Sequence, residues 1–186
     1  MSFTTITKDG EVTENVDISD VVENAVAQQS SDSGIAVYAE SGARTTSTGK
    51  VIVVLDPGHG GFDPGTDGFG ANEKDLTLKI AKYCKAALEK DGRIQVYMTR
   101  ETDTSVGNTT NVSTDLYNRI QYAIGKKANL FVSIHLNSAT ASAAKGAEVY
   151  YPNSNYRTDI GAQGKALATD IQNELVKLGL YNRGAK

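Results

Sequence analysis

Cysteine, histidine, proline and long apolar runs are all scarce in this sequence of 186 residues. The single cysteine, Cys84, excludes a disulfide within the chain. No stretch approaches the roughly 20 consecutive apolar residues of a membrane-spanning helix, so we expect no insertion into a membrane. The opening residues, Met1 to Thr5, lack the charged and then apolar order of a secretory signal peptide. We therefore expect a soluble chain with no signal peptide in these residues.

A large excess of charge of one sign is also missing, since 19 basic and 22 acidic side chains give a net charge of −3. Residues 1–49 contain two basic and eight acidic side chains, whereas residues 50–186 contain 17 basic and 14 acidic ones. The second region is compatible with an anionic polymer as partner, but its positive excess is too small to indicate nucleic acid. We expect no nucleic-acid partner.

Residues 1–49 differ from the rest of the chain in composition. They contain no proline and are rich in serine, threonine and acidic side chains, which is typical of a linker or a pro-segment. Asp20 and Glu23 could cap a short helix over residues 21–26, and such a helix would suit a docked pro-segment. We predict a polar extension over residues 1–49 and one globular domain over residues 50–186.

The globular domain alternates between strand and helix patterns. The continuous apolar run Val51–Leu55 is typical of a strand that is covered on both faces. Further strands are predicted over residues 94–98, 130–135 and 148–151. Helical spacing of apolar residues predicts three helices, each ended by a glycine: Leu76, Ile80, Tyr83, Ala87 and Leu88 before Gly92; Leu116, Ile120, Ala123 and Ile124 before Gly125; and Leu167, Ile171, Leu175 and Leu178 before Gly179. This order predicts an α/β fold with a mostly parallel sheet and helices on both faces.

The only two histidines follow two different predicted strands. His59 lies in a glycine-rich loop after the first strand, and His135 ends the third. Because the carboxyl ends of parallel strands meet at one sheet edge, we expect the two imidazoles to lie together. The alternative for each is an isolated, hydrogen-bonded loop histidine. Two imidazoles favour zinc, for which a carboxylate often supplies a third ligand.

Glu73 is the best candidate for the third ligand, because it opens the helix that follows the His59 loop. The alternative is that its charge stabilises the helix dipole. Asp56, Asp63 and Asp67 are rival acids. We interpret Asp56, at the end of the first strand, as a partner that orients a ligand histidine.

Several motifs on different elements resemble one enzyme family. The motifs are, in order, Asp56-Pro57-Gly58-His59-Gly60-Gly61, Asp63-Pro64-Gly65, Asn72-Glu73-Lys74, Thr99-Arg100 with Asp103, Leu116 with Arg119, and Ser133-Ile134-His135-Leu136-Asn137. From about Val51 to Lys186 the chain thus resembles the zinc-dependent N-acetylmuramoyl-L-alanine amidases of bacteria and their phages, of the amidase 3 type. In that family the corresponding positions bind zinc, so the resemblance implies that His59, Glu73 and His135 hold a Zn²⁺ ion.

The activity that this resemblance implies is hydrolysis of the amide bond between N-acetylmuramic acid and L-alanine in peptidoglycan. Zinc would polarise the scissile carbonyl and lower the pKa of a bound water towards about 7. The resemblance also implies peptidoglycan as partner and a secreted or wall-associated protein.

The family has a further catalytic glutamate, in a Val-Glu-x-Gly-Phe type of motif on a strand near the end of the domain. No carboxylate follows Glu174 in this sequence, and residues 181–186 resemble the stretch before that strand. We therefore expect the general-base glutamate to be absent and the catalytic domain to be incomplete at its C-terminal end. Glu148 is a poorer candidate for the base, because a strand residue with a solvent-facing or hydrogen-bonded side chain is the favoured interpretation of it.

Other polar residues have both a substrate-binding and a structural interpretation. Arg100 and Arg119 could bind carboxylates of the stem peptide or could tether loops. Asn137 could polarise a substrate carbonyl or cap a turn. Two alternatives to the amidase stay open: a zinc-containing wall-binding or regulatory module with little turnover, and a related zinc peptidase.

Overall fold

The computed structural model describes residues 2–6, 12–17, 49–68, 70–138, 145–152 and 160–186. The residues from 49 onward fall into two units, one ending at Ser138 and the other beginning after it. The first unit contains a three-stranded sheet and the second contains a smaller strand pair.

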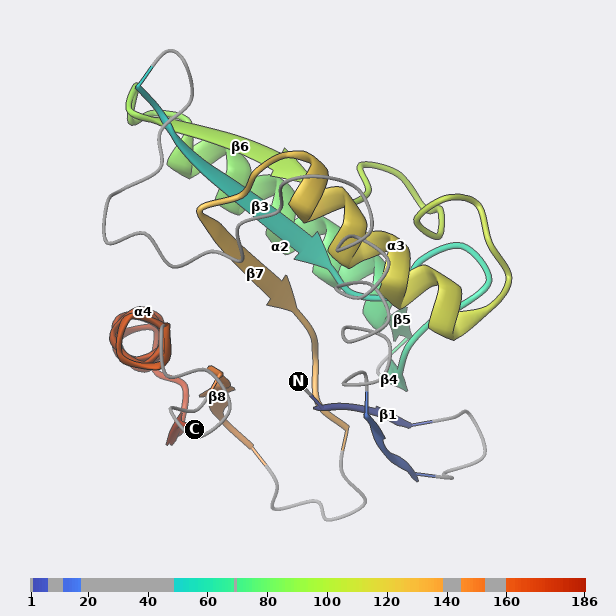
Figure 1. The fold of residues 1–186 in the computed structure, drawn as a ribbon. Coiled ribbons are helices and arrows are strands. Elements are labelled where there is room, and N and C mark those ends of the chain that lie inside the picture. The colour runs from blue at the N-terminus through green and yellow to red at the C-terminus, as the bar shows by residue number, and fades with distance from the viewer. Residues whose placement is uncertain (1, 7–11, 18–48, 69, 139–144, 153–159) are drawn as a thin grey trace. The chain divides into compact units, whose positions relative to one another are not determined.

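The sheet of the first unit is parallel, with β3 (Val51–Pro57) between β6 (Ile94–Met98) and β7 (Leu130–Ile134). Helix α2 (Glu73–Leu88) covers one face and α3 (Val112–Gly125) covers the other (Figure 1). The predicted α/β class, with parallel strands and helices on both faces, is confirmed.

Residues 51–55 of the central strand β3 are apolar because both faces of the strand are covered. Val53 and Leu55 pack with Ala81 of α2 in the main core cluster. The alternate residues face α3, and there Asp56 pairs with Arg119. The strand therefore carries an apolar core on one side and a buried ion pair on the other.

Helix α2 buries a different face from the one that its apolar spacing predicts. Leu76 and Ile80, on the expected face, are 38% and 39% exposed, whereas Thr77 and Ala81 are fully buried. The small Ala81 side chain allows close packing on the sheet. The Thr77 hydroxyl donates to the Gly58 carbonyl over 2.9 Å, so its burial leaves no polar group unpaired.

The boundaries of two elements also differ from the prediction. Helix α2 ends at Leu88, and Gly92 lies in the turn that follows. Strand β7 is half-buried, because it lies at an edge of the three-stranded sheet, and it ends one residue before His135.

One small element of the first unit was not predicted from the sequence. Strands β4 (Asp67–Gly68) and β5 (Ala71–Asn72) form a short antiparallel pair directly before α2. This pair leads the chain from the His59 loop into the helix.

The second unit consists of β8 (Ala147–Val149), α4 (Gly161–Lys177) and β9 (Asn182–Ala185). The predicted strand over residues 148–151 is thus shorter and begins one residue earlier. Strand β9 was not predicted, because its residues show no apolar alternation. It pairs in parallel with β8, and the buried Gln172 side chain of α4 bonds to both strands.

Before residue 49 the described residues form β1 (Ser2–Ile6) and β2 (Val12–Asp17), an antiparallel pair that the sequence did not predict. The proposed short helix over residues 21–26 lies outside the described residues. The division between residues 1–49 and 50–186 stays a prediction. Within the part of the chain that the structure describes, no helix is long and apolar enough to cross a membrane.

Candidate metal centre

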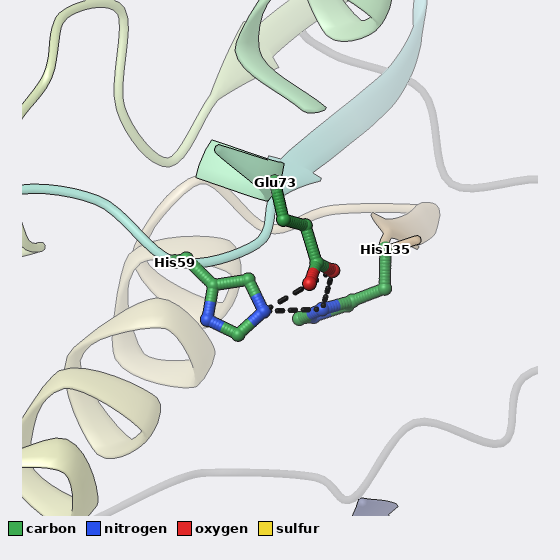
Figure 2. Close-up of side chains that lie close together, drawn as sticks. All are labelled: His59, Glu73 and His135. Carbon is green, nitrogen blue, oxygen red and sulfur yellow. Dashed lines mark hydrogen bonds and ion pairs between the residues drawn. The ribbon is translucent and has the colours of Figure 1, made fainter. Parts of the chain in front are cut away.

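Three side chains from separate elements meet at the carboxyl edge of the sheet (Figure 2). His59 lies in the loop after β3, His135 follows β7, and Glu73 is the first residue of α2. Because β3 and β7 are adjacent parallel strands, their ends bring the two histidines to the same place. The structure thus brings together the three residues that the sequence singled out as metal ligands.

The donor atoms of these residues form a nearly equilateral triangle. His59 Nε2 lies 3.2 Å from Glu73 Oε1. His135 Nδ1 lies 3.1 Å from His59 Nε2 and 3.1 Å from Glu73 Oε1. Zinc bonds of about 2.1 Å at tetrahedral angles place two ligand atoms about 3.4 Å apart. The spacing and the set of two nitrogens and one oxygen therefore fit a single zinc ion.

The triangle is buried on one side and open on the other. The side chains of His59 and Glu73 are 9% and 4% exposed, whereas the side chain of His135 is 33% exposed. An ion bound by these residues would therefore be reachable from the His135 side, as a site with an open coordination position requires.

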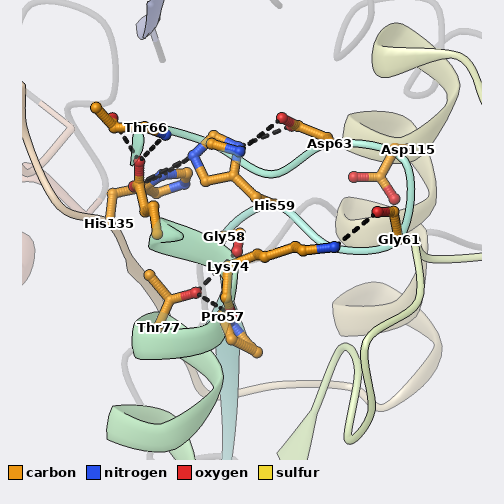
Figure 3. A network of polar contacts seen from close by, with 12 residues as sticks. Pro57, Gly58, His59, Gly61, Asp63, Thr66, Lys74, Thr77, Asp115 and His135 are labelled. Atoms are coloured by element: carbon orange, nitrogen blue, oxygen red, sulfur yellow. Dashed lines mark hydrogen bonds and ion pairs between the residues drawn. The ribbon is translucent and has the colours of Figure 1, made fainter. Parts of the chain in front are cut away.

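Asp63 orients His59. Its Oδ2 lies 2.7 Å from His59 Nδ1, and its Oδ1 accepts a hydrogen bond from the Gly65 backbone N–H over 3.0 Å (Figure 3). A proton on Nδ1 satisfies this contact and leaves the lone pair of Nε2 directed at Glu73 and His135. The sequence had named Asp63 only as a rival acid, and its position four residues after His59 was the available signal.

Asp56 does not orient a histidine, so that interpretation was wrong. Its carboxylate bonds to Arg119 at 2.8 Å, Thr99 at 2.6 Å and Ser133 at 2.7 Å. Burial alone would raise the pKa of Asp56, but the Arg119 charge and these hydrogen bonds hold it below its usual value. The reason is alternation along β3, which directs Asp56 to the α3 face.

Arg119 and Arg100 hold the backbone of the His59 loop. Arg119 donates to the carbonyls of Pro57 at 2.9 Å and His59 at 2.6 Å. Arg100, which is 4% exposed, donates to the carbonyls of Pro57 at 3.0 Å and Gly58 at 2.9 Å. These contacts favour the loop-tethering interpretation of both arginines. They also support His59 in a left-handed backbone conformation, with φ 62°.

The remaining polar candidates lie in different surroundings. Asn137, two residues after His135, is exposed beyond the end of β7. Glu148 of β8 accepts hydrogen bonds from Arg183 at 3.0 Å and Lys186 at 2.6 Å, and its side chain is 6% exposed. Burial raises the pKa of Glu148, but these cations outweigh that effect and lower it. This pairing favours a structural role for Glu148.

The charges in the triangle stabilise one another when no ion is present. Burial disfavours the charged imidazole of His59, but hydrogen bonds and charge from Asp63 and Glu73 outweigh burial and raise the pKa of His59 to about 9. Burial also opposes the charge of Glu73, but hydrogen bonds from the two histidines lower the pKa of Glu73 below its usual value. A carboxylate that stays ionised is a suitable metal ligand.

Comparison with known proteins identifies relatives over most of the chain. A family model described as N-acetylmuramoyl-L-alanine amidase matches residues 53–186. An endolysin of Bacillus phage SPP1 is 37% identical over 136 residues, which cover 73% of this chain and 46% of the endolysin. The amidase LytC of Bacillus subtilis is 36% identical over 135 residues, which cover 72% of this chain and 25% of LytC. This chain therefore spans less than half the length of these curated relatives.

A solved structure agrees with this result. The N-acetylmuramoyl-L-alanine amidase from Clostridium difficile 630 superposes with a TM-score of 0.62 at 35% sequence identity, covering 74% of this chain and 69% of that one. The match in sequence extends over both units, and the solved structure shares the fold. This chain belongs to the N-acetylmuramoyl-L-alanine amidase family of cell-wall hydrolases.

Proposed function

We propose that this chain is a zinc-dependent amidase domain that hydrolyses the amide bond between N-acetylmuramic acid and L-alanine in peptidoglycan. Membership of the family supports the choice of bond. The observation that carries zinc dependence is the triangle of two imidazole nitrogens and one carboxylate oxygen, with sides of 3.1 to 3.2 Å.

His59 would hold the ion through Nε2, His135 through Nδ1 and Glu73 through Oε1. A zinc ion bound there supplies a Lewis acid for the scissile carbonyl and lowers the pKa of a coordinated water. Asp63 keeps the His59 ring in the required orientation. The exposed side of His135 provides the approach for substrate.

Among the candidates for substrate binding, the surroundings favour Asn137 over Arg100. Asn137 is exposed two residues after His135, whereas Arg100 is 4% exposed. We assign no general base among the described residues. Glu148, the alternative candidate for the base, forms ion pairs with Arg183 and Lys186 instead.

The partner of this site is peptidoglycan, and the place of action is the cell wall. The relatives named above include a phage endolysin and a bacterial N-acetylmuramoyl-L-alanine amidase, which supports this location.

Zinc dependence is tested by metal analysis of the purified chain. We expect about one zinc per chain and its loss in Glu73→Gln. The matched control is Glu89→Gln, because Glu89 is an exposed residue directly after the other end of the same helix. Stoichiometric zinc in both variants would contradict the assignment of Glu73.

The bond specificity is tested with muropeptides and with stem peptides that lack muramic acid. We expect new L-alanine amino termini from the muropeptides only, and their loss after chelation. Cleavage of the free stem peptides would favour a zinc peptidase. Binding to peptidoglycan with no new amino termini at full zinc occupancy would favour a wall-binding module.

A further inference from the structure

The two carboxylate oxygens of Glu73 have different surroundings. Oε1 faces His59 and His135 and also accepts a hydrogen bond from the Leu136 backbone N–H over 2.7 Å. Oε2 accepts two hydrogen bonds from one residue, Thr66, whose backbone N–H lies 3.0 Å away and whose hydroxyl lies 2.9 Å away. Both of these donors belong to Thr66, which lies in the loop between His59 and β4 (Figure 3).

Thr66 and Glu73 are joined by contacts in both directions. The backbone N–H of Glu73 donates to the Thr66 carbonyl over 2.8 Å, so three hydrogen bonds connect the two residues. Gly65 makes this approach possible, because a Cβ built on it would lie only 2.8 Å from Glu73 Cβ. The side chain of Asn72 makes no capping hydrogen bond at the start of α2, so the position of Glu73 depends on the loop.

A carboxylate that binds a metal ion with both oxygens must turn both of them towards the ion. For Glu73 that rotation would break the two hydrogen bonds to Oε2 and leave the Thr66 donors unpaired in a site where Glu73 is 4% exposed. Donors left unpaired in such a part-buried site are unfavourable. The hydrogen bonds therefore favour a geometry in which only Oε1 faces the ion.

We propose that Thr66 is a positioning residue that restricts Glu73 to a one-oxygen ligand and thereby favours a four-coordinate zinc site over a site with more ligand atoms. This inference rests on the proposed zinc site. The positioning role is assigned to the hydroxyl of Thr66, because a side-chain substitution at this position leaves the backbone N–H in place. Zinc is satisfied by four ligands, whereas Ca²⁺ takes six to eight oxygens and uses two-oxygen carboxylates readily.

The test compares Thr66→Val with Thr66→Ser. Valine retains the branched shape and removes only the hydroxyl, whereas serine retains the hydroxyl. We expect Thr66→Val to bind zinc about ten to a hundredfold more weakly than the parent chain, as is typical when a partner of a metal ligand is lost. With Co²⁺ in place of zinc, we expect the intense visible absorption of a four-coordinate site to weaken in Thr66→Val and to be retained in Thr66→Ser.

The outcomes separate this inference from the function on which it rests. Failure of the parent chain to bind zinc or Co²⁺ would overturn both. Unchanged affinity and an unchanged Co²⁺ spectrum in Thr66→Val, with zinc bound to the parent chain, would overturn the role of Thr66 alone. Far-ultraviolet circular dichroism of each metal-free variant checks folding. Equal weakening in Thr66→Ser would also overturn the role of the hydroxyl.

Discussion

At the scale of single residues, the centre depends on side chains that fix the direction of the three donor atoms. His59, Glu73 and His135 were recognisable from the sequence because their types and order match a family pattern. Thr66, which holds Glu73, is an ordinary loop residue in sequence terms, and Asp63, which holds His59, was named from the sequence only as a motif residue and a rival acid. Their roles follow from hydrogen bonds of 2.7 to 3.0 Å that the loop geometry alone creates.

Asp63→Asn should weaken zinc binding about ten to a hundredfold, because the amide loses the charge that holds the Nδ1 proton of His59. The dissociation constant is measured by competition with a coloured chelator. Asp67→Asn serves as the control, since Asp67 is an exposed acid four residues later in the same segment. Equal affinities for both variants would show that Asp63 does not position the ligand.

Without zinc, the stability of the chain should decrease as the pH rises from about 6.5 to 9. The pKa of His59 is raised from 6.5 to about 9, so its contribution is complete below pH 6.5 and is lost as the pH passes through about 9. The lowered pKa of Glu73 acts in the opposite direction, because its contribution is lost on acidification below its usual 4.5. Denaturant unfolding in EDTA across this range measures the slope. A slope of the same size in His59→Asn would contradict the assignment to His59.

At the scale of elements, two glycines allow the strand ends and α2 to meet. A Cβ built on Gly58 would overlap Cε1 of His135, and a Cβ on Gly65 would lie 2.6 Å from Cδ2 of His59. The imidazole rings therefore lie directly against backbone that carries no side chain. Contact with the His135 ring explains the glycine at Gly58, whereas Gly65 is required both by its contact with His59 and by its positive φ of 66°.

Gly58→Ala should displace the His135 ring and lower zinc affinity, while the sheet remains folded. Gly68→Ala is the matched control, because a Cβ built at Gly68 meets no atom within 4 Å. Zinc affinity and circular dichroism are measured for both. Normal zinc affinity in Gly58→Ala would mean that His135 can bind from another position.

The contact between β3 and α3 depends on a buried cluster of charges. Arg119 pairs with Asp56 at 2.8 Å and with Asp115 at 2.6 Å, and all three side chains are at most 9% exposed. Arg119→Met leaves both carboxylates without their cation, which should lower the free energy of unfolding by about 3–5 kcal/mol.

Lys177→Met provides the comparison, because Lys177 forms an ion pair with Glu174 in which each side chain is 70% exposed. Such a pair contributes about 0.5 kcal/mol or less. Denaturant unfolding of both variants gives the two values. A loss under about 1 kcal/mol in Arg119→Met would show that the cluster is replaceable.

At the scale of the whole molecule, residues 1–49 should be separable from the rest. Their composition offers little apolar surface to offset the entropy of ordering. Limited proteolysis followed by mass spectrometry should yield a core that begins near Lys50. Protection of residues 21–26 would instead support a docked pro-segment.

The sequence by itself determined the class of fold and the identity of the candidate ligands. A continuous apolar run marked the fully covered strand that precedes His59, and His135 follows the strand that pairs with it in parallel. These are local patterns and rules of connection, which a single sequence carries. Strand β9 was missed because residues 182–185 have no apolar alternation, and its pairing with β8 is visible only in the tertiary structure.

Only the tertiary structure decided which face of α2 is buried and which acid orients His59. Thr77 can replace an apolar residue in the core because its hydroxyl reaches the Gly58 carbonyl, a partner 19 residues away. Asp56 pairs with Arg119, a residue 63 positions later, and Asp63 is the acid that bonds to His59. The physical reason is that a buried polar group is placed by the partner that satisfies it, and periodicity along the chain does not reveal that partner.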